Sequence, residues 1–170
     1  MITNLPKYLV TTLILFLLQV LLLNHMSITT LEITPYLFLV FLLMLDFEIP
    51  RWLVLLIGFG GGMLMDIFSD TYGLQMVSCT FAAYMRSSIL KIDAPREGYD
   101  KGTTPSVEYF GWQWFIKYSS LMVISHHLLF FCFESFSFKN FHFTIVKVIL
   151  TSIYTLAVIL LHQLLILKRK

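Results

Sequence analysis

Long uncharged apolar runs recur along the chain and are separated by short polar segments. Two clear examples cover residues 9–23 and 53–65, and neither run contains an acidic or a basic side chain. A helix needs about 20 mainly apolar residues to cross a bilayer, and runs of this kind are typical of membrane-spanning helices. The pattern predicts an all-α, polytopic bundle of six transmembrane helices, at about residues 8–23, 34–47, 52–68, 74–90, 112–133 and 143–167.

The second predicted helix, residues 34–47, has the shortest apolar stretch. Pro35 suits the first turn of a helix, but Asp46 and Glu48 end the stretch early. The segment therefore has two interpretations. It is either a helix that crosses the membrane or a re-entrant segment that leaves on the side where it entered, which would put the two chain ends in different compartments.

The basic residues favour six crossings. With a cytoplasmic N-terminus, all basic residues except Lys139 and Lys147 fall in cytoplasmic segments: Lys7, Arg51, Arg86, Lys91, Arg96, Lys101, Lys117, Lys168, Arg169 and Lys170. This distribution follows the positive-inside rule, whereas five crossings would place one basic chain end outside. We therefore expect one transmembrane domain over residues 1–170, with both termini in the cytoplasm and a flexible, solvated cytoplasmic loop at residues 91–111.

Composition excludes a soluble enzyme. Hydrophobic residues make up 58% of the chain and charged residues 13%, against about 25% charged residues in a typical soluble domain. The first apolar run ends in Asn24-His25-Met26 without a small-residue cleavage site, which predicts an uncleaved first helix. Cys79 and Cys132 both fall in apolar spans and are interpreted as small membrane-buried thiols.

The third predicted helix carries a regular face of small residues. Gly58, Gly62 and Asp66 are spaced four apart, so they share one side of the helix. Glycines at this spacing let a second helix approach closely inside a membrane. That second helix is either the predicted helix 74–90 of the same chain, which we favour, or the helix of a partner protein.

Asp66 needs a polar partner because an aspartate costs about 3 kcal/mol at the centre of a bilayer. The predicted helix 74–90 offers a stripe of polar and small side chains: Gln75, Ser78, Cys79, Ala82 and Arg86. A short turn joins the two helices, so we expect Gln75 to contact Asp66. A proton or ion relay is the alternative, although such relays usually contain several acidic residues.

A second polar group is expected at the outer end of helix 112–133. His127 and Glu134 are seven apart and share a face, and Lys147 is a candidate partner for Glu134. A zinc site needs three or four ligands, and the adjacent His126 and His127 point about 100° apart on a helix. We therefore expect polar contacts inside the bundle rather than a metal site. No catalytic residues and no cofactor are expected, because no nucleophile has a base nearby.

The segment 58–92 resembles the MreD family, small membrane proteins of the bacterial rod-shape system. The resembling elements are the glycine-rich start, then Met65-Asp66, Gly73-Leu74 and a small-residue helix that ends near Tyr84. The six predicted spans, Pro35 and the basic tail also match, and the turn at residues 134–138 resembles the version in Bacteroidetes-type bacteria. The sequence Asp70-Thr71-Tyr72 departs from the pattern, in which the turn residues are smaller or apolar.

The resemblance implies a non-enzymatic, multi-pass scaffold of the bacterial inner (cytoplasmic) membrane that regulates cell shape and peptidoglycan synthesis. The implied partners are a bitopic MreC-like protein and the peptidoglycan polymerase and transpeptidase of the elongation complex. An MreB-type cytoskeleton would be contacted through the loop 91–111, and nucleic acid is not an expected partner.

The alternative function is the substrate-binding membrane component of an energy-coupling-factor transporter. Those components are also six-helix proteins of similar size, and the MreD family itself looks like them. They dock through an alanine-rich face on their first helix, and the predicted helix 8–23 contains no alanine.

Overall fold

The computed structural model describes residues 5–25, 33–100, 102–135 and 141–168. For residues 5–9 and 25 it describes the backbone alone. The described residues form six α-helices: α1 (Leu5–Leu21), α2 (Val40–Leu43), α3 (Arg51–Ser69), α4 (Leu74–Ile92), α5 (Val107–Ser135) and α6 (Phe141–Lys168). Single turns of 3₁₀ helix, Leu23–His25 and Leu37–Leu39, follow α1 and precede α2. The predicted all-α class is confirmed for this part of the chain.

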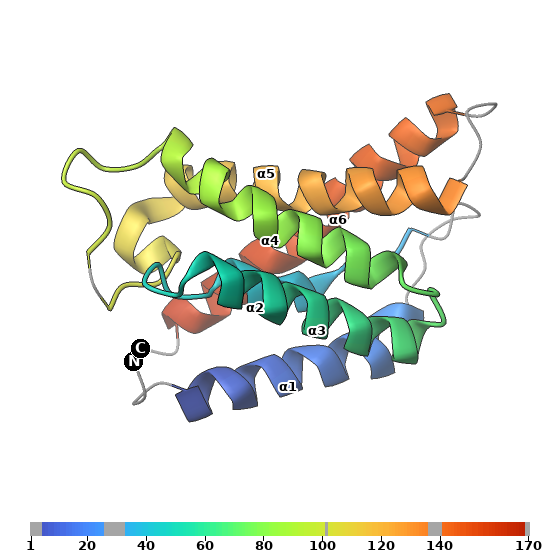
Figure 1. The fold of residues 1–170 in the computed structure, drawn as a ribbon, viewed down its shortest axis with the longest axis horizontal. Coiled ribbons are helices and arrows are strands. Elements are labelled where there is room, and N and C mark those ends of the chain that lie inside the picture. The colour runs from blue at the N-terminus through green and yellow to red at the C-terminus, as the bar shows by residue number, and fades with distance from the viewer. Residues whose placement is uncertain (1–4, 26–32, 101, 136–140, 169–170) are drawn as a thin grey trace.

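The long helices lie side by side along the long axis of the molecule (Figure 1). We call the end where α3 begins and α4 finishes the basic end, and the opposite end, where a short turn joins α3 to α4, the hairpin end. In Figure 1, α1 starts at the basic end and α6 finishes there. The first and last described residues therefore lie at the same end of the bundle.

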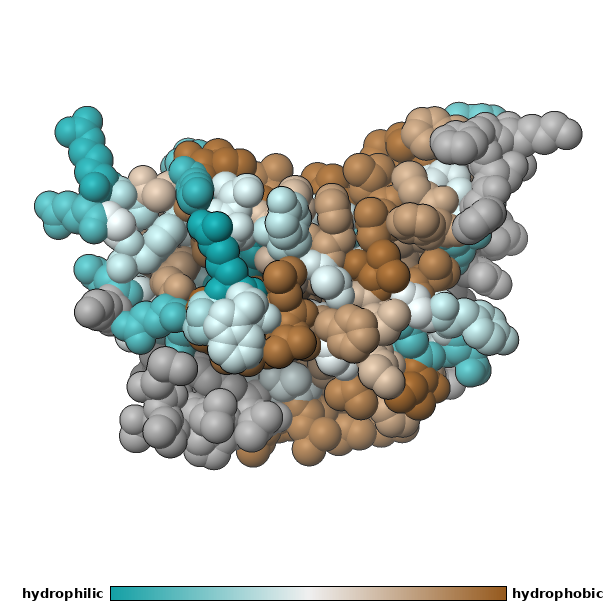
Figure 2. Space-filling view, in the orientation of Figure 1, coloured by the Kyte–Doolittle hydropathy of each residue, from teal (hydrophilic) through white to brown (hydrophobic). Residues whose placement is uncertain are grey.

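Three helices, α3, α5 and α6, are long and apolar enough to cross a membrane, and α1 contains a shorter apolar stretch, Val10–Leu21. Large apolar side chains are exposed along these helices, among them Leu13, Ile67 and Ile153, each about 60% exposed. In Figure 2 hydrophobic residues cover the middle of the visible face. A contiguous exposed apolar surface of this kind is typical of a protein that meets lipid.

The continuous helix predicted at 34–47 is wrong. The structure has only a 3₁₀ turn and the four-residue α2 here, within a segment of residues 33–50 that we call the broken segment. In Figure 1 this segment passes from the hairpin end to the basic end, where α3 starts. Pro35 supplies no backbone N–H, and side chains of neighbouring helices replace the missing helical hydrogen bonds, as described below.

The other helices start and finish close to the predicted positions. The main difference is at α5, which begins at Val107 instead of residue 112 because Gly111, with φ 76° and ψ 171°, joins a short first turn to the long helix. Only glycine adopts this backbone conformation readily.

The loop between α4 and α5, which we expected to be flexible and solvated, is anchored at one point. Residues 94–98 are exposed, but the Tyr99 ring stacks on Phe47 with centroids 4.1 Å apart. The Tyr99 hydroxyl also donates a hydrogen bond of 2.6 Å to the Leu90 carbonyl. Burial raises the pKa of Tyr99, so the phenol keeps its proton and this hydrogen bond to a higher pH than a fully exposed tyrosine would.

Candidate functional site

The glycine face of α3 packs against α4 of the same chain. A Cβ atom on Gly58 would lie 2.8 Å from the Ala83 Cβ, and one on Gly62 would lie 2.5 Å from both the Gln75 carbonyl oxygen and the Met76 Cα. Real side chains do not approach this closely, so the two backbones are in direct contact. Because α4 covers this face, Gly58 and Gly62 are not available to dock a partner helix.

Asp66 caps the start of α4. Its carboxylate accepts hydrogen bonds from the Thr71 hydroxyl at 2.5 Å and from the backbone N–H groups of Gln75 at 3.0 Å and Met76 at 2.8 Å. The predicted contact between Asp66 and Gln75 is therefore confirmed, but it uses the Gln75 backbone. The first N–H groups of a helix have no partner within it and attract negative charge, which explains how the bundle accommodates this acid.

Gln75 and Ala82 lie on the buried face of α4. Each is about 1% exposed. Ala82 packs among side chains of α2 and α5, including Leu42 and Val123. These two predicted site residues therefore belong to the interior of the bundle.

The histidine pair is also internal. The His127 Nδ1 lies 3.0 Å from the Ser152 hydroxyl of α6, and the Tyr36 ring packs on His127 with centroids 5.1 Å apart. Glu134 instead forms an ion pair of 2.8 Å with Lys147. The predicted polar contact and the predicted ion pair are both present, but His127 and Glu134 have separate partners. Within the described residues, no group of three or more His, Cys, Asp or Glu side chains is placed to hold a metal ion.

Two side chains from different helices hold the start of the broken segment. Gln19 of α1 is fully buried, accepts a hydrogen bond of 3.3 Å from the Phe38 N–H and donates one of 2.9 Å to the Pro35 carbonyl. The hydroxyl of Thr155 in α6 accepts a hydrogen bond of 3.1 Å from the Tyr36 N–H. These groups satisfy backbone atoms that a regular helix would pair internally.

Two further side chains hold its other end. The Tyr118 hydroxyl of α5 donates to the Leu43 carbonyl at 3.1 Å, and Arg86 of α4 donates from Nη2 to the Leu45 carbonyl. The Arg86 Nε also donates to the Tyr118 hydroxyl at 3.1 Å. The last carbonyls of a helix lack internal partners, so Tyr118 satisfies that of Leu43 at the end of α2, and the buried Arg86 satisfies the Leu45 carbonyl just beyond it.

Sequence reasoning missed these four anchoring roles. It placed Arg86 on the polar stripe of helix 74–90 but assigned no contact to it. The available signal was the isolated amide of Gln19 within an apolar run, because such a group needs a buried hydrogen-bond partner. The identity of that partner depends on how the helices assemble.

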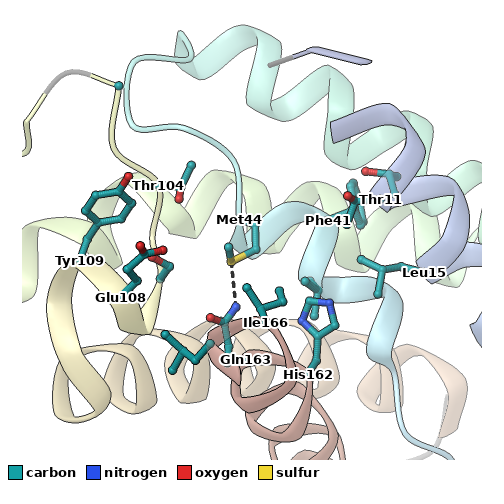
Figure 3. Close-up of a pocket in the computed structure, with 15 residues that line it drawn as sticks. Thr11, Leu15, Phe41, Met44, Thr104, Glu108, Tyr109, His162, Gln163 and Ile166 are labelled. Atoms are coloured by element: carbon teal, nitrogen blue, oxygen red, sulfur yellow. Dashed lines mark hydrogen bonds between the residues drawn. The ribbon is translucent and has the colours of Figure 1, made fainter. Parts of the chain in front are cut away.

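A cavity of about 240 Å³ lies beside the broken segment (Figure 3). Its wall combines α1, α2, α6 and the chain that enters α5, and the labelled side chains include Phe41, Met44, Glu108 and Tyr109. Non-helical backbone at membrane depth is tolerated where protein buries it or where it lines a cavity. The broken segment and this cavity together form the candidate functional site.

The cavity wall carries unused hydrogen-bonding capacity. The Ser106 hydroxyl and the His162 Nδ1 are buried and have no hydrogen-bond partner among the described residues. Nearby, Gln163 donates to the Met44 sulfur at 3.1 Å, a weak acceptor (Figure 3). A mainly apolar wall with a few polar groups suits a small amphipathic molecule.

Comparison with known proteins gives no family for this chain: no protein-family model, curated protein or solved structure matches it.

Proposed function

We propose that this protein is a non-enzymatic scaffold of the bacterial cell-elongation complex, in which it binds partner membrane proteins and helps to regulate cell shape and lateral peptidoglycan synthesis. The proposal rests on the contacts made by the residues that carry the resemblance to the MreD family. Gly58 and Gly62 bring two helices together, and Asp66 caps the second of them. Their contacts build a rigid α3–α4 hairpin, which is what a scaffold requires.

In this proposal the chain crosses the cytoplasmic membrane of a bacterium six times, and the broken segment makes the second crossing. The basic end faces the cytoplasm. In support, the described basic residues near that end are Arg51, Arg86, Lys91, Arg96, Lys117 and Lys168, whereas Lys147 lies near the start of α6 at the hairpin end. Lys101, Lys139, Arg169, Lys170 and the side chain of Lys7, for which the sequence also predicts a side of the membrane, lie outside the described part of the chain.

The proposed partners follow from the family resemblance. They are an MreC-like protein with a single membrane span, and the polymerase and transpeptidase that build peptidoglycan during elongation. The loop between α4 and α5, at the basic end, is the proposed contact for an MreB-type filament. The anchoring of Tyr99 supports this, because it gives the loop a fixed position from which to present its exposed residues 94–98.

One observation favours the transporter component as a second candidate. The cavity beside the broken segment is lined by residues of α1, α2, α5 and α6, and its wall has polar atoms at Ser106 and His162 without a partner among the described residues. Transporters often build substrate sites from interrupted helices near the middle of the membrane. A small bound molecule in this cavity would explain both the interruption and the unpartnered atoms.

Purification of the tagged full-length chain in mild detergent from its own bacterium distinguishes the two candidates. We expect a single-span membrane protein to co-purify in a stable ratio, as identified by mass spectrometry. An unrelated polytopic protein of similar size with the same tag serves as the control and should not retain that partner. A tightly bound small molecule without any single-span partner would contradict the scaffold and support the transporter component.

A further inference from the structure

A cationic pocket opens between the start of α3 and the finish of α4, at the basic end. Its volume is about 500 Å³, and three cationic side chains, Arg51, Arg86 and Lys91, contribute to its wall. Ser87 and Ser88 add hydroxyl groups, and Ala83 and Leu55 form its apolar side. In Figure 2 hydrophilic side chains gather at this end of the visible face.

The positive charge of this pocket is not cancelled by its own wall. No carboxylate is among the residues that line it, within the part of the chain that the structure describes. Both hydrogen-bond partners of Arg86 are neutral oxygen atoms, so these bonds leave its charge in place. The nearby Asp93 forms an ion pair of 2.9 Å with Lys117.

An apolar groove continues from the pocket along the outside of the α3–α4 hairpin. This second hollow, of about 440 Å³, shares Leu55 and Tyr84 with the cationic pocket and is otherwise lined by Phe59, Met76, Val77, Thr80 and Phe81. The Thr80 hydroxyl donates to the Met76 carbonyl at 2.7 Å, so the groove itself is apolar. The two hollows together offer a charged head region and an apolar tail region on one face.

We propose that this face binds an anionic phospholipid, with its phosphate among Arg51, Arg86 and Lys91 and one acyl chain in the α3–α4 groove. Trp52, which is more than half exposed, lies in the first turn of α3 at the same end, and such an aromatic side chain favours the headgroup level of a bilayer. Anionic headgroups attract nearby lysine and arginine residues. The proposal goes beyond the scaffold role and does not depend on it.

Native mass spectrometry of the full-length chain in detergent micelles tests the proposal, with phosphatidylglycerol as the probe and phosphatidylcholine of the same chain length for comparison. We expect phosphatidylglycerol to bind at one preferred site. The double variant R51Q/K91Q should weaken this binding by about tenfold or more, since it removes two of the three basic groups that attract the anionic headgroup. Arg51 and Lys91 are both exposed, so these changes leave the core intact.

The matched control is R96Q/K168Q, which removes the same charge from exposed positions at the same end but outside the pocket. It should bind phosphatidylglycerol like the unmodified chain. Equal weakening in both double variants, or equal binding of phosphatidylcholine, would overturn the proposal. Displacement of the lipid by equimolar inorganic phosphate would also overturn it and would indicate a site for free phosphate.

Discussion

The variant Gly62→Ala is expected to lose about 3 kcal/mol of stability, at the upper end of the usual cost of overpacking a core. The added methyl group would lie 2.5 Å from both the Gln75 carbonyl oxygen and the Met76 Cα, which are backbone atoms and cannot rotate away. The two helices of the hairpin must therefore separate, which also weakens the hydrogen bonds from α4 to Asp66. Thermal unfolding in detergent, followed by tryptophan fluorescence, measures the change.

Gly60→Ala is the matched control for this prediction. A Cβ atom at Gly60 meets nothing within 4 Å, although this residue lies only two positions away in the same helix. Alanine has a higher helix propensity than glycine by about 1 kcal/mol, so this variant should be as stable as the original chain or slightly more stable. Equal stability of the two variants would contradict the close packing of α3 on α4.

The variant Gln19→Leu is expected to destabilise the protein by about 3 kcal/mol. Leucine has a similar size but no amide, so the Phe38 N–H and the Pro35 carbonyl lose their partner inside the bundle. Each buried backbone group left without a hydrogen bond costs roughly 1–3 kcal/mol. We also expect faster proteolysis within residues 33–50, which limited digestion followed by mass spectrometry would detect.

Gln163→Leu provides the comparison for Gln19→Leu. Both glutamines are about 2% exposed or less, and both lie against the broken segment. Among the described residues, Gln163 donates to the sulfur of Met44, a weak acceptor, so its replacement should cost less than about 1 kcal/mol. If the two leucine variants had equal stability and equal resistance to proteolysis, the anchoring role of Gln19 would be wrong.

The sequence predicted the regular helices well because their boundaries depend on local signals. The start of α4 follows the turn at Gly73, with φ 93°, and α3 and α6 are long and predominantly apolar. The contact between Asp66 and Gln75 was also predictable, because a turn of a few residues forces the two positions together. The sequence could not predict which atom of Gln75 makes the contact, because its side-chain amide and its backbone N–H lie close to each other.

The broken segment could not be predicted for a physical reason. An apolar stretch after a proline has the composition of a helix, and nothing within residues 34–47 indicates that the α-helix will be only four residues long. The interruption is stabilised by Gln19, Arg86, Tyr118 and Thr155, which are contributed by four other helices. A pattern of hydrophobic residues does not say which of these distant side chains will meet the segment.

The same limit applies to the histidines and the glycine face. His127 and Glu134 share a helical face, but the position of α6 decides that Ser152 meets the first and Lys147 the second. The spacing of Gly58 and Gly62 indicated close helix packing and favoured helix 74–90 as the second helix, but it left a partner's helix as the alternative. The structure identifies the second helix as α4 and thereby changes the experiment, because substitutions at these glycines test folding and not partner binding.

Cysteine labelling in intact cells tests most directly whether the broken segment, α3 and α4 cross the membrane in alternation, as the six-crossing arrangement requires. In a background with Cys79 and Cys132 replaced by alanine, single cysteines are placed at Thr29, Glu48, Tyr72 and Thr104, one in each of four successive connections. Six crossings with a cytoplasmic basic end predict that an impermeant reagent added outside labels Thr29→Cys and Tyr72→Cys, whereas Glu48→Cys and Thr104→Cys react only after the membrane is opened. Labelling of Thr29→Cys and Glu48→Cys from the same side would show that the broken segment does not cross, and would contradict this arrangement.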